Sequence, residues 1–370
     1  MLLCATSAFA TDHFVYFGTY TGAKSKGIYV SRFDSTTGKL SEPELAAETK
    51  NPSFLAVPPK EHFLYAVGEV DRTQGQPGGA VNAFAIDGKT GKLTALNQQT
   101  SGGAGPCHVS VDATGKCVLV ANYGSGSIAA LPIQTDGRLG AAVTTIQHVG
   151  SSVNPTRQAG PHAHFFIPSP DNRFALACDL GLDKVLVYQL DPATARLTTN
   201  NPPHAVVPHG AGPRHLAFLP NGKFAYVINE MALTITVFSY DAVRGTFFEE
   251  QNVSTVPAGY TSTTKDSTAE IAVHPNGKFV YGSNRGHDSI AVFSSDEWNG
   301  KLTLVQNEST QGKTPRHFAI DPTGKWLLAE NQNSDSVVVF TIDQATGKLK
   351  PTGQTITVDS PVCAVFVTAN

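Results

Sequence analysis

The chain has 370 residues and a formal net charge of −3 at pH 7, with 15% charged and 41% hydrophobic residues. No basic run accompanies this balance, which argues against nucleic acid as a partner. No apolar stretch approaches the roughly 18 residues of a membrane-spanning helix, so no membrane partner is expected. The 34 glycines and 23 prolines indicate a globular chain with many turns.

The N-terminal residues MLLCATSAFATD are apolar and include Ala8-Phe9-Ala10, a small-x-small pattern typical of a signal-peptidase site. No basic segment precedes them, as in the trimmed end of a longer signal peptide. We therefore expect residues 1–11 to be a signal-peptide remnant or a disordered start, and residues 12–370 to form a single domain. The expected compartment is periplasmic or extracellular, with the cytoplasm as the alternative.

One motif recurs along the chain: a start residue, an alternating apolar strand and a turn at Gly-Lys. Three copies read GPCHVSVDATGKCVLVAN (105–122), GPRHLAFLPNGKFAYVINE (212–230) and TPRHFAIDPTGKWLLAEN (314–331). Alternation on both sides of a tight polar turn is typical of a β-hairpin. Aligned on the turn, the seven starts are Pro52, Pro106, Pro161 (with a slightly longer turn), Pro213, Thr268, Pro315 and Pro361.

A second series of hairpin turns lies between these copies, at residues 36–40, 90–93, 136–139, 194–197, 244–247, 299–302 and 346–349. Each repeat therefore holds four strands in roughly 45–55 residues, which is the length of a propeller blade. The last copy, SPVCAVFV (360–367), supplies only a first strand, while residues 13–19 match a second strand. The pattern predicts an all-β, seven-bladed β-propeller in which the N- and C-terminal strands share one blade and close the ring.

In such a blade the start of the first strand and the end of the second lie at the same edge. These positions from seven blades should form a ring at one mouth of the central channel. Two residues after the start position stand Phe54, His108, His164 (by a shifted alignment), His215, Glu270, His317 and Cys363. At the far end of the hairpins stand Thr19-Tyr20, Gly68-Glu69, Asn122-Tyr123, Asp179-Leu180, Asn229-Glu230, Asn284-Arg285 and Asn331-Gln332.

This ring carries more charge than contacts between blades require. We interpret His108 and Asn122 as structural, and the remaining polar set as a site: His164, Arg214, Glu230, Glu270, Arg285 and Arg316. Several arginines around a cavity need an anionic ligand or paired acids. Histidine and glutamate can act as general base and acid, and arginines can bind a carboxylate or phosphate and stabilise an oxyanion.

Other catalytic and metal motifs do not occur. There is no GxSxG or HExxH sequence, so covalent catalysis is not supported. The cysteines show no metal-type spacing and are expected to be small buried hydrophobes: Cys4, Cys107, Cys117, Cys178 and Cys363. No cofactor is expected, and a divalent metal ion at the mouth stays open as an alternative.

At these residues the sequence resembles the seven-bladed propeller lactonase family, which includes propeller-type 6-phosphogluconolactonases and the fungal 3-carboxy-cis,cis-muconate lactonizing enzyme. The stretches that carry the resemblance are GPHAHF (160–165), DLGLDKV (179–185), GPRHLAF (212–218), INE (228–230), SNRGHDSI (283–290) and TPRHFAIDPTGK (314–325). The resemblance implies a lactone-handling enzyme whose site lies in the channel mouth.

Residue by residue, the resemblance points to a catalytic cluster of His162 or His164 with Arg214, Glu230 and Arg285. The accompanying substrate-binding residues are Arg316, Glu270, His215, Asp179 and His317. In the mechanism that we infer, His164 or Glu230 activates water against the lactone carbonyl and Arg214 holds the oxyanion. Arg285 and Arg316 then bind the acidic end of the substrate.

We expect hydrolysis of a sugar lactone, resembling 6-phosphogluconolactonase, by a monomer whose partner is a small lactone with an anionic or polar end. If the protein is exported, an unphosphorylated sugar lactone fits better, because phosphorylated sugar lactones are cytosolic metabolites. Two alternatives stay open. One is a cycloisomerase acting on a muconate-type lactone, and the other is a non-catalytic propeller that binds an acidic ligand.

Overall fold

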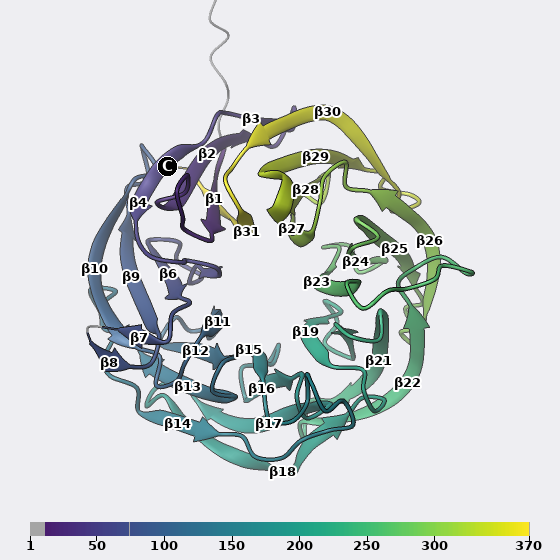
Figure 1. Cartoon of the computed structure of the whole chain (residues 1–370). Helices are drawn as coiled ribbons and strands as arrows, with labels where there is room; N and C mark the ends of the chain where they lie inside the picture. Colours follow the sequence, from purple (N-terminus) through teal and green to yellow (C-terminus); the bar gives the residue numbers. More distant parts are fainter. Residues whose placement is uncertain (1–11, 74, 370) are drawn as a thin grey trace, which may run out of the picture.

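The computed structural model describes residues 12–73 and 75–369, which form a ring of seven β-sheets around a central axis (Figure 1). Within these residues there is one short 3-10 helix, η1 (Gln332–Ser334), and no α-helix. The predicted seven-bladed β-propeller is therefore confirmed. The predicted signal-peptide remnant, residues 1–11, lies outside the described residues.

Each blade is a sheet whose strands follow one another from the channel outward. Blade 1 contains β31 (Pro361–Thr368), β1 (His13–Thr19) and β2 (Gly27–Asp34), with β3 (Lys39–Leu40) and β4 (Glu44–Glu48) both pairing with β2. Blade 2 contains β5 (Leu55–Ala56), β6 (Phe63–Gly68), β9 (Ala80–Ile86) and β10 (Leu93–Thr100), and carries the small hairpin of β7 (Arg72–Thr73) and β8 (Gln76–Pro77). Blade 3 contains β11 (Pro106–Val111), β12 (Cys117–Asn122), β13 (Ser127–Pro132) and β14 (Thr144–Gln147).

The other four blades have the same plan. Blade 4 contains β15 (Ala163–Pro168), β16 (Phe174–Asp179), β17 (Lys184–Asp191) and β18 (Arg196–Val206). Blade 5 contains β19 (Pro213–Phe218), β20 (Phe224–Asn229), β21 (Thr234–Asp241) and β22 (Thr246–Ser254). Blade 6 contains β23 (Ser267–Val273), β24 (Phe279–Arg285), β25 (Ser289–Ser295) and β26 (Leu302–Ser309). Blade 7 contains β27 (Pro315–Ile320), β28 (Trp326–Asn331), β29 (Ser336–Ile342) and β30 (Leu349–Thr357).

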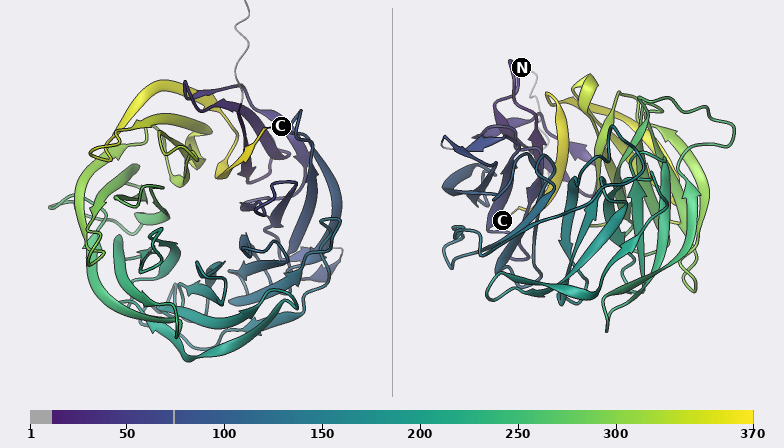
Figure 2. Two further views of the ribbon diagram at one scale, coloured as in Figure 1. Left: turned by 180° about the vertical axis from the view of Figure 1, so that it is seen from behind. Right: turned by 60° about the horizontal axis from the view of Figure 1, so that its bottom comes forward.

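The ring closes through strands from opposite ends of the chain. β1 pairs antiparallel with β31 from His13↔Thr368 to Thr19↔Pro361, and both views in Figure 2 show these strands side by side. The pairing occupies an edge of β1 that would otherwise be open to another chain. The predicted sharing of one blade by the two terminal segments is confirmed.

The glycines of the repeated turns serve two purposes: they allow the backbone conformation of the turn, and they allow close packing against the neighbouring blade. In the turn after β19, Gly222 has a φ of 70°, which is where glycine is favoured. In the outer turn of blade 6, a Cβ on Gly300 would lie 2.4 Å from the ring of Phe224 in blade 5. The same packing recurs for Gly245 on Phe174 and for Gly347 on Phe279. The glycines of these outer turns thus help to set the distance between neighbouring blades.

Candidate active site

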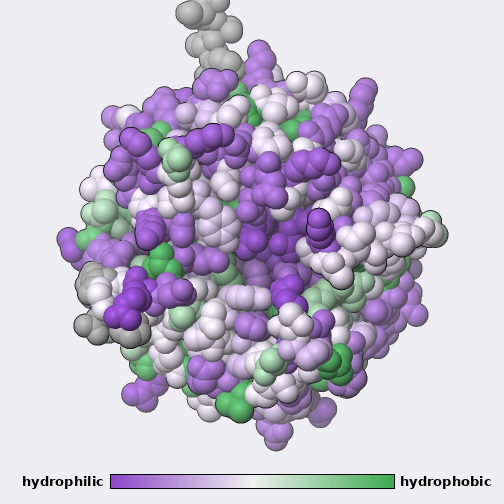
Figure 3. All heavy atoms as spheres, in the orientation of Figure 1, coloured by the Kyte–Doolittle hydropathy of each residue, from purple (hydrophilic) through white to green (hydrophobic). Residues whose placement is uncertain are grey.

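A cavity of about 1050 Å³ opens at one end of the channel, and hydrophilic residues gather in the hollow at the centre of the ring (Figure 3). Ends of innermost strands, ends of second strands and two loops contribute to its wall. Its lining residues include Tyr20, Glu69, Cys107, Tyr123, Arg157, His164, Glu230, Met231, Arg285 and Arg316, together with residues 262–267.

Glu230 accepts ion pairs from three arginines. Its oxygens lie 2.7 Å from Nη2 of Arg157, 3.2 Å from Nε of Arg214 and 3.0 Å from Nη2 of Arg285. Burial alone would raise the pKa of Glu230, but the charges of Arg285 and Arg214 and the hydrogen bond from Arg157 lower it to about 2. The carboxylate is therefore ionised at neutral pH, and its oxygens are already engaged.

Arg214 is held from several sides beneath the cavity. Its Nη1 donates to the backbone carbonyl of Ala269 at 2.7 Å and to Nε2 of His215 at 3.2 Å. Burial and the charges of Arg285 and Arg316 lower the pKa of Arg214 to about 10, outweighing the attraction of Glu230. The guanidinium remains charged at neutral pH, and its orientation is fixed before any ligand binds.

A second polar group lies across the cavity. Arg316 donates from Nη2 to the Tyr20 hydroxyl at 3.0 Å, and Tyr20 donates to Glu69 at 2.8 Å. Ser53 donates to the same Glu69 oxygen. Burial alone would lower the pKa of Arg316, but the negative character of Tyr20, Glu69 and Glu230 raises it. The cavity thus has fixed positive charge on two sides.

His164 lines the cavity, whereas His162 lies beside it. The ring of His162 stacks on Tyr123 with 4.6 Å between centroids, and its Nδ1 lies 3.0 Å from the Tyr123 carbonyl oxygen. The buried Nδ1 of His164 has no hydrogen-bond partner among the described residues. Burial and the charges of Arg214, His215 and Arg316 hold the pKa of His164 well below its ordinary value. Its imidazole is therefore neutral at pH 7.

The register of the strands corrects the predicted alignment of His164. Pro213 pairs with Asn229, and the equivalent pair in blade 4 is Ala163↔Asp179. His164 therefore occupies the place of Arg214, not that of His215. We name two sets by this register: the mouth ring is Ser53, Cys107, His164, Arg214, Ala269, Arg316 and Val362, and the inner ring is Phe54, His108, Phe165, His215, Glu270, His317 and Cys363.

Adjacent residues face the channel because the innermost strands bulge. The register shifts between the start position and the inner-ring residue, as between Pro213 and His215, in six of the seven blades. A bulge places two residues opposite one, so successive side chains no longer point to opposite faces. Arg214 and His215 can therefore contact each other on the channel side.

Asp179 lies outside this cavity. It is fully buried, lies 2.6 Å from Nδ1 of His148, and accepts hydrogen bonds from the backbone amides of His162 and Gly181. It takes the place of Asn229 and the other buried asparagines that end the second strands. The substrate-binding role predicted for Asp179 therefore has no support in this geometry.

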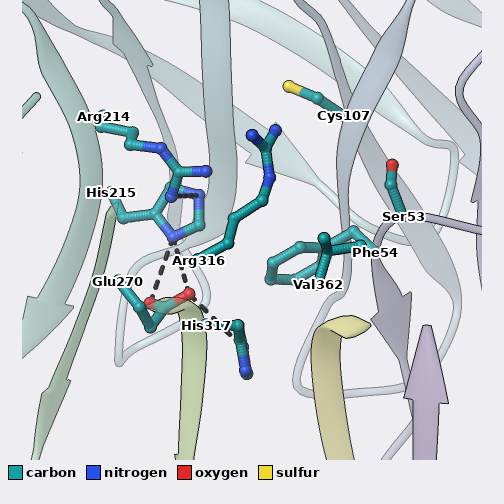
Figure 4. A pocket seen from close by; sticks show the side chains of 9 residues that line it. All are labelled: Ser53, Phe54, Cys107, Arg214, His215, Glu270, Arg316, His317 and Val362. Carbon is teal, nitrogen blue, oxygen red and sulfur yellow. Dashed lines mark hydrogen bonds and ion pairs between the residues drawn. The ribbon is translucent and has the colours of Figure 1, made fainter. Parts of the chain in front are cut away.

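The predicted residues His215, Glu270 and His317 lie in the inner ring, below the mouth ring (Figure 4). They line a chamber with room for about 10 Å³, too little for a substrate, together with Ser53, Phe54, Cys107, Arg214, Arg316 and Val362. Glu270 lies within 3.3 Å of both imidazoles. Arg214, which lines this chamber, connects these residues to Glu230 in the wall of the cavity.

Sequence reasoning missed Arg157. It comes from the loop between β14 and β15, outside the repeated hairpins, and also donates to the Tyr123 hydroxyl at 3.1 Å. The available signal was length, because 15 residues separate Gln147 from Ala163. A similar long connection, between Ser254 and Ser267, supplies the other loop of the cavity wall.

The described residues hold no group of three or more His, Cys, Asp or Glu side chains arranged for a metal ion. Over the same ranges, no helix has the length and apolar character needed to cross a membrane. The four described cysteines are buried and free, as expected, and Cys4 lies outside the described residues.

Fold and cavity together define a seven-bladed propeller with an arginine-rich site at one end of its channel. Residues 14–366 match the family model described as Lactonase, 7-bladed beta-propeller. The chain is 40% identical over 357 residues to the 6-phosphogluconolactonase of Bacillus subtilis, covering 96% of this chain and 99% of that protein.

Solved structures give the same result. A Bacteroides fragilis protein matches with a TM-score of 0.90 and 39% identity, covering 97% of this chain and 98% of that one. The periplasmic gluconolactonase PpgL of Pseudomonas aeruginosa matches with a TM-score of 0.90 and 34% identity, covering 97% and 99%. The chain belongs to the seven-bladed β-propeller lactonase family, and it is a lactonase.

Proposed function

We propose that this lactonase hydrolyses a sugar lactone that carries an anionic group, such as 6-phosphogluconolactone. The observation that carries the proposal is the sharing of one carboxylate, Glu230, by three guanidinium groups. Positive charge therefore remains available for a phosphate or carboxylate. The name of the Bacillus subtilis relative supports the same substrate class.

His164 is the proposed general base. Glu230 is a poor candidate because its two carboxylate oxygens are already engaged by three cationic partners, whereas Nδ1 of His164 has no hydrogen-bond partner among the described residues. His164 lines the cavity, is neutral, and is not paired with a carboxylate. It removes a proton from water as the water oxygen attacks the lactone carbonyl. The ring C–O bond then breaks, and the leaving oxygen takes up a proton, giving the open hydroxy acid.

Arg214 is the proposed oxyanion donor. Its contacts with Glu230, Ala269 and His215 fix the guanidinium without help from a ligand. A donor that is already oriented needs no reorganisation when charge develops on the carbonyl oxygen. Glu230 itself acts as the residue that positions the arginines.

Arg157, Arg285 and Arg316 are the proposed anion-binding residues. All three line the cavity, and the side chain of Arg157 is 42% exposed, which suits contact with an incoming substrate. Guanidinium groups bind phosphate and carboxylate through paired hydrogen bonds.

The test is a hydrolysis assay on purified protein with 6-phosphogluconolactone, gluconolactone and a muconolactone, after subtraction of spontaneous hydrolysis. Arg285→Ala should raise KM for the phosphorylated lactone, and Glu230→Ala should abolish most turnover. The matched control is Arg244→Ala. Arg244 is an exposed arginine in the turn between β21 and β22 and does not line the cavity. Turnover of none of the three lactones would contradict the proposal and favour a binding propeller, and turnover of the muconolactone alone would favour the cycloisomerase.

The cellular compartment of the protein affects which lactone is the better candidate substrate. We propose export from the Ala8-Phe9-Ala10 pattern, and PpgL is named as periplasmic. In that compartment a neutral gluconolactone becomes the second candidate substrate. Fractionation of cells that produce the full chain, followed by mass spectrometry of the mature N-terminus, tests this, and an uncleaved chain retained inside the cell would contradict it.

A further inference from the structure

Below the mouth ring, five titratable side chains from blades 5 to 7 form one buried chain of hydrogen bonds. Nη1 of Arg214 lies 3.2 Å from Nε2 of His215, whose Nδ1 lies 3.0 Å from Oε2 of Glu270. The same oxygen lies 3.3 Å from Nε2 of His317. Nδ1 of His317 lies 2.9 Å from Oε2 of Glu330. Figure 4 shows the links from Arg214 to His317.

The donors in this chain fix the protonation of His215. A guanidinium only donates hydrogen bonds, so Nε2 of His215 must accept from Arg214. The imidazole is neutral because burial and the charge of Arg214 lower its pKa well below the ordinary value. The ring proton therefore lies on Nδ1 and is donated to Glu270.

The same reasoning places the proton of His317 on its other nitrogen. The backbone amide of Ala364 donates to Nδ1 of His317 at 3.2 Å, so this nitrogen presents a lone pair. Its Nε2 then donates to Glu270. Glu270 accepts hydrogen bonds from both imidazole N–H groups and from the backbone amide of Ile271 at 2.9 Å. Burial raises the pKa of Glu270, but these donors and the charge of Arg214 oppose that rise and suit an ionised carboxylate.

Glu330 must be a neutral acid in this arrangement. An ionised carboxylate 2.9 Å from the lone pair of His317 would be repelled, whereas a carboxylic acid can donate to this lone pair and share it with the amide of Ala364. Burial raises the pKa of Glu330 well above the ordinary value, and the charge of Glu270 raises it further. The titratable groups that face Glu330 are His317, Glu270 and the buried thiol of Cys363.

The propeller fold does not require a carboxyl group at this place. The position equivalent to Glu330, one before the residue that pairs with the start of the blade, is small or apolar in the other blades, where it is Gly18, Val67, Ala121, Cys178, Ile228 and Ser283. Glu330 is fully buried, so it cannot serve solubility. Burying a carboxyl group costs free energy, and its place at the end of the chain of hydrogen bonds points to a function.

We propose that Glu270 is a positioning residue for lactone hydrolysis, acting through His215 on Arg214, and that a protonated Glu330, together with the backbone amide of Ala364, holds the tautomer of His317 that Glu270 requires. The inference rests on the oxyanion role proposed for Arg214. Glu270 orients the imidazole of His215, and that ring holds the Nη1 side of the guanidinium. The guanidinium plane of Arg214 therefore keeps its orientation while negative charge develops on the carbonyl oxygen of the lactone.

Two isosteric variants separate this proposal from a merely structural role. Glu270→Gln loses the charge and presents an amide N–H group to one of the two imidazole N–H groups. We expect its kcat to fall at least about 10-fold, short of the 10²–10³ typical for loss of an oxyanion donor, with KM changed less than about 2-fold. Glu330→Gln keeps a donor toward His317 and replaces a neutral group with a neutral group. Because Glu330 acts on Glu270 only through His317, we expect its kcat to fall less than that of Glu270→Gln, whereas the matched control Glu249→Gln, at an exposed glutamate of β22, should retain wild-type kcat and KM.

Infrared spectroscopy tests Glu330 without any substrate. At pH 7 the wild type should show a carbonyl band of a protonated carboxylic acid that Glu330→Gln removes. If a variant does not fold, nitrogen-15 spectra of the wild-type imidazoles decide, with His215 protonated at Nδ1 and His317 at Nε2. An ionised Glu330, the opposite tautomer at His215, wild-type kcat in Glu270→Gln, or equal losses in both variants would overturn the proposal. Absence of lactone turnover in the wild type would instead overturn the proposed function.

Discussion

Replacing Glu230 with glutamine removes the one negative charge that three guanidinium groups share, while the volume of the side chain is kept. The pKa of about 2 for Glu230, against an ordinary 4.5, corresponds to roughly 3 kcal/mol by which the fold favours the ionised form. We therefore expect Glu230→Gln to lower the free energy of unfolding at pH 7 by about 3 kcal/mol. For a chain of this length, that corresponds to a fall in Tm of roughly 4 °C.

The stabilisation by Glu230 should decrease at low pH, because it requires the ionised carboxylate. The contribution of a carboxylate with a lowered pKa is fully present above its unfolded pKa and is lost as pH falls through its folded pKa. The Tm difference between wild type and Glu230→Gln should be constant from pH 8 to about 5. It should shrink as pH falls below 4.5 toward 2. Differential scanning fluorimetry across this range measures it.

Anions and a control variant complete the experiment. Inorganic phosphate should raise the Tm of Glu230→Gln more than that of the wild type, because it can take the place of the missing charge. Glu249→Gln, at an exposed glutamate of β22, should match the wild type at every pH. A Tm of Glu230→Gln within 1 °C of the wild type at pH 7 would refute the reasoning, whatever the phosphate response.

Three kinetic predictions follow from the same geometry. His164→Ala should lower kcat by about 10²–10⁴ with little change in KM, and because the pKa of His164 is depressed, wild-type kcat/KM should stay flat from pH 8 to below pH 6; a pH–rate profile that falls near pH 6.5 would count against this base. Arg157→Ala should raise KM for the phosphorylated lactone and leave KM for gluconolactone unchanged in steady-state assays, and equal effects on both would contradict anion binding. Arg214→Ala should lower kcat by about 10²–10³, and single-turnover rates equal to wild type would exclude an oxyanion role.

The blades could be predicted because their signals are local and repeated. A hairpin is encoded within some twenty residues by alternation and by a turn glycine such as Gly222. The pairing of Pro213 with Asn229 follows from the turn, so the meeting of these two positions at one edge was also predictable. The closing pair of β1 and β31 followed because each terminal segment matched one half of a hairpin.

The side of the strand to which an individual side chain points was harder to predict, because a β-bulge has no sequence pattern of its own. By simple alternation Arg214 and His215 should point to opposite faces, yet both reach the channel. The blade 4 segment was therefore aligned one residue off, and Phe165 occupies the place that the alignment assigned to His164. The geometry places Asp179 away from the cavity for a related reason: it takes the position of Asn229, whose side chain is buried and donates to Thr234 and Thr236.

Arg157 could not be found by comparing blades, because it belongs to a loop with no counterpart in the repeat. Only the partner it reaches, Glu230, lies in a repeated position. Comparison of the repeats therefore identifies the cavity residues that belong to the repeated hairpins. The loops that determine which substrate fits are found only in the folded molecule.

The bulged position is suited to chemistry because seven innermost strands converge there and each can vary without disturbing its hairpin. Convergence also limits what the mouth ring can hold, and each of its long side chains, His164, Arg214 and Arg316, has a smaller residue in at least one neighbouring blade. In this ring the residues on either side of Arg316, in blades 6 and 1, are Ala269 and Val362, and Ser53 follows Val362. The small side chain at Ala269 leaves its carbonyl oxygen open to Arg214. Small residues in some blades are therefore as necessary to the site as the charged residues in others.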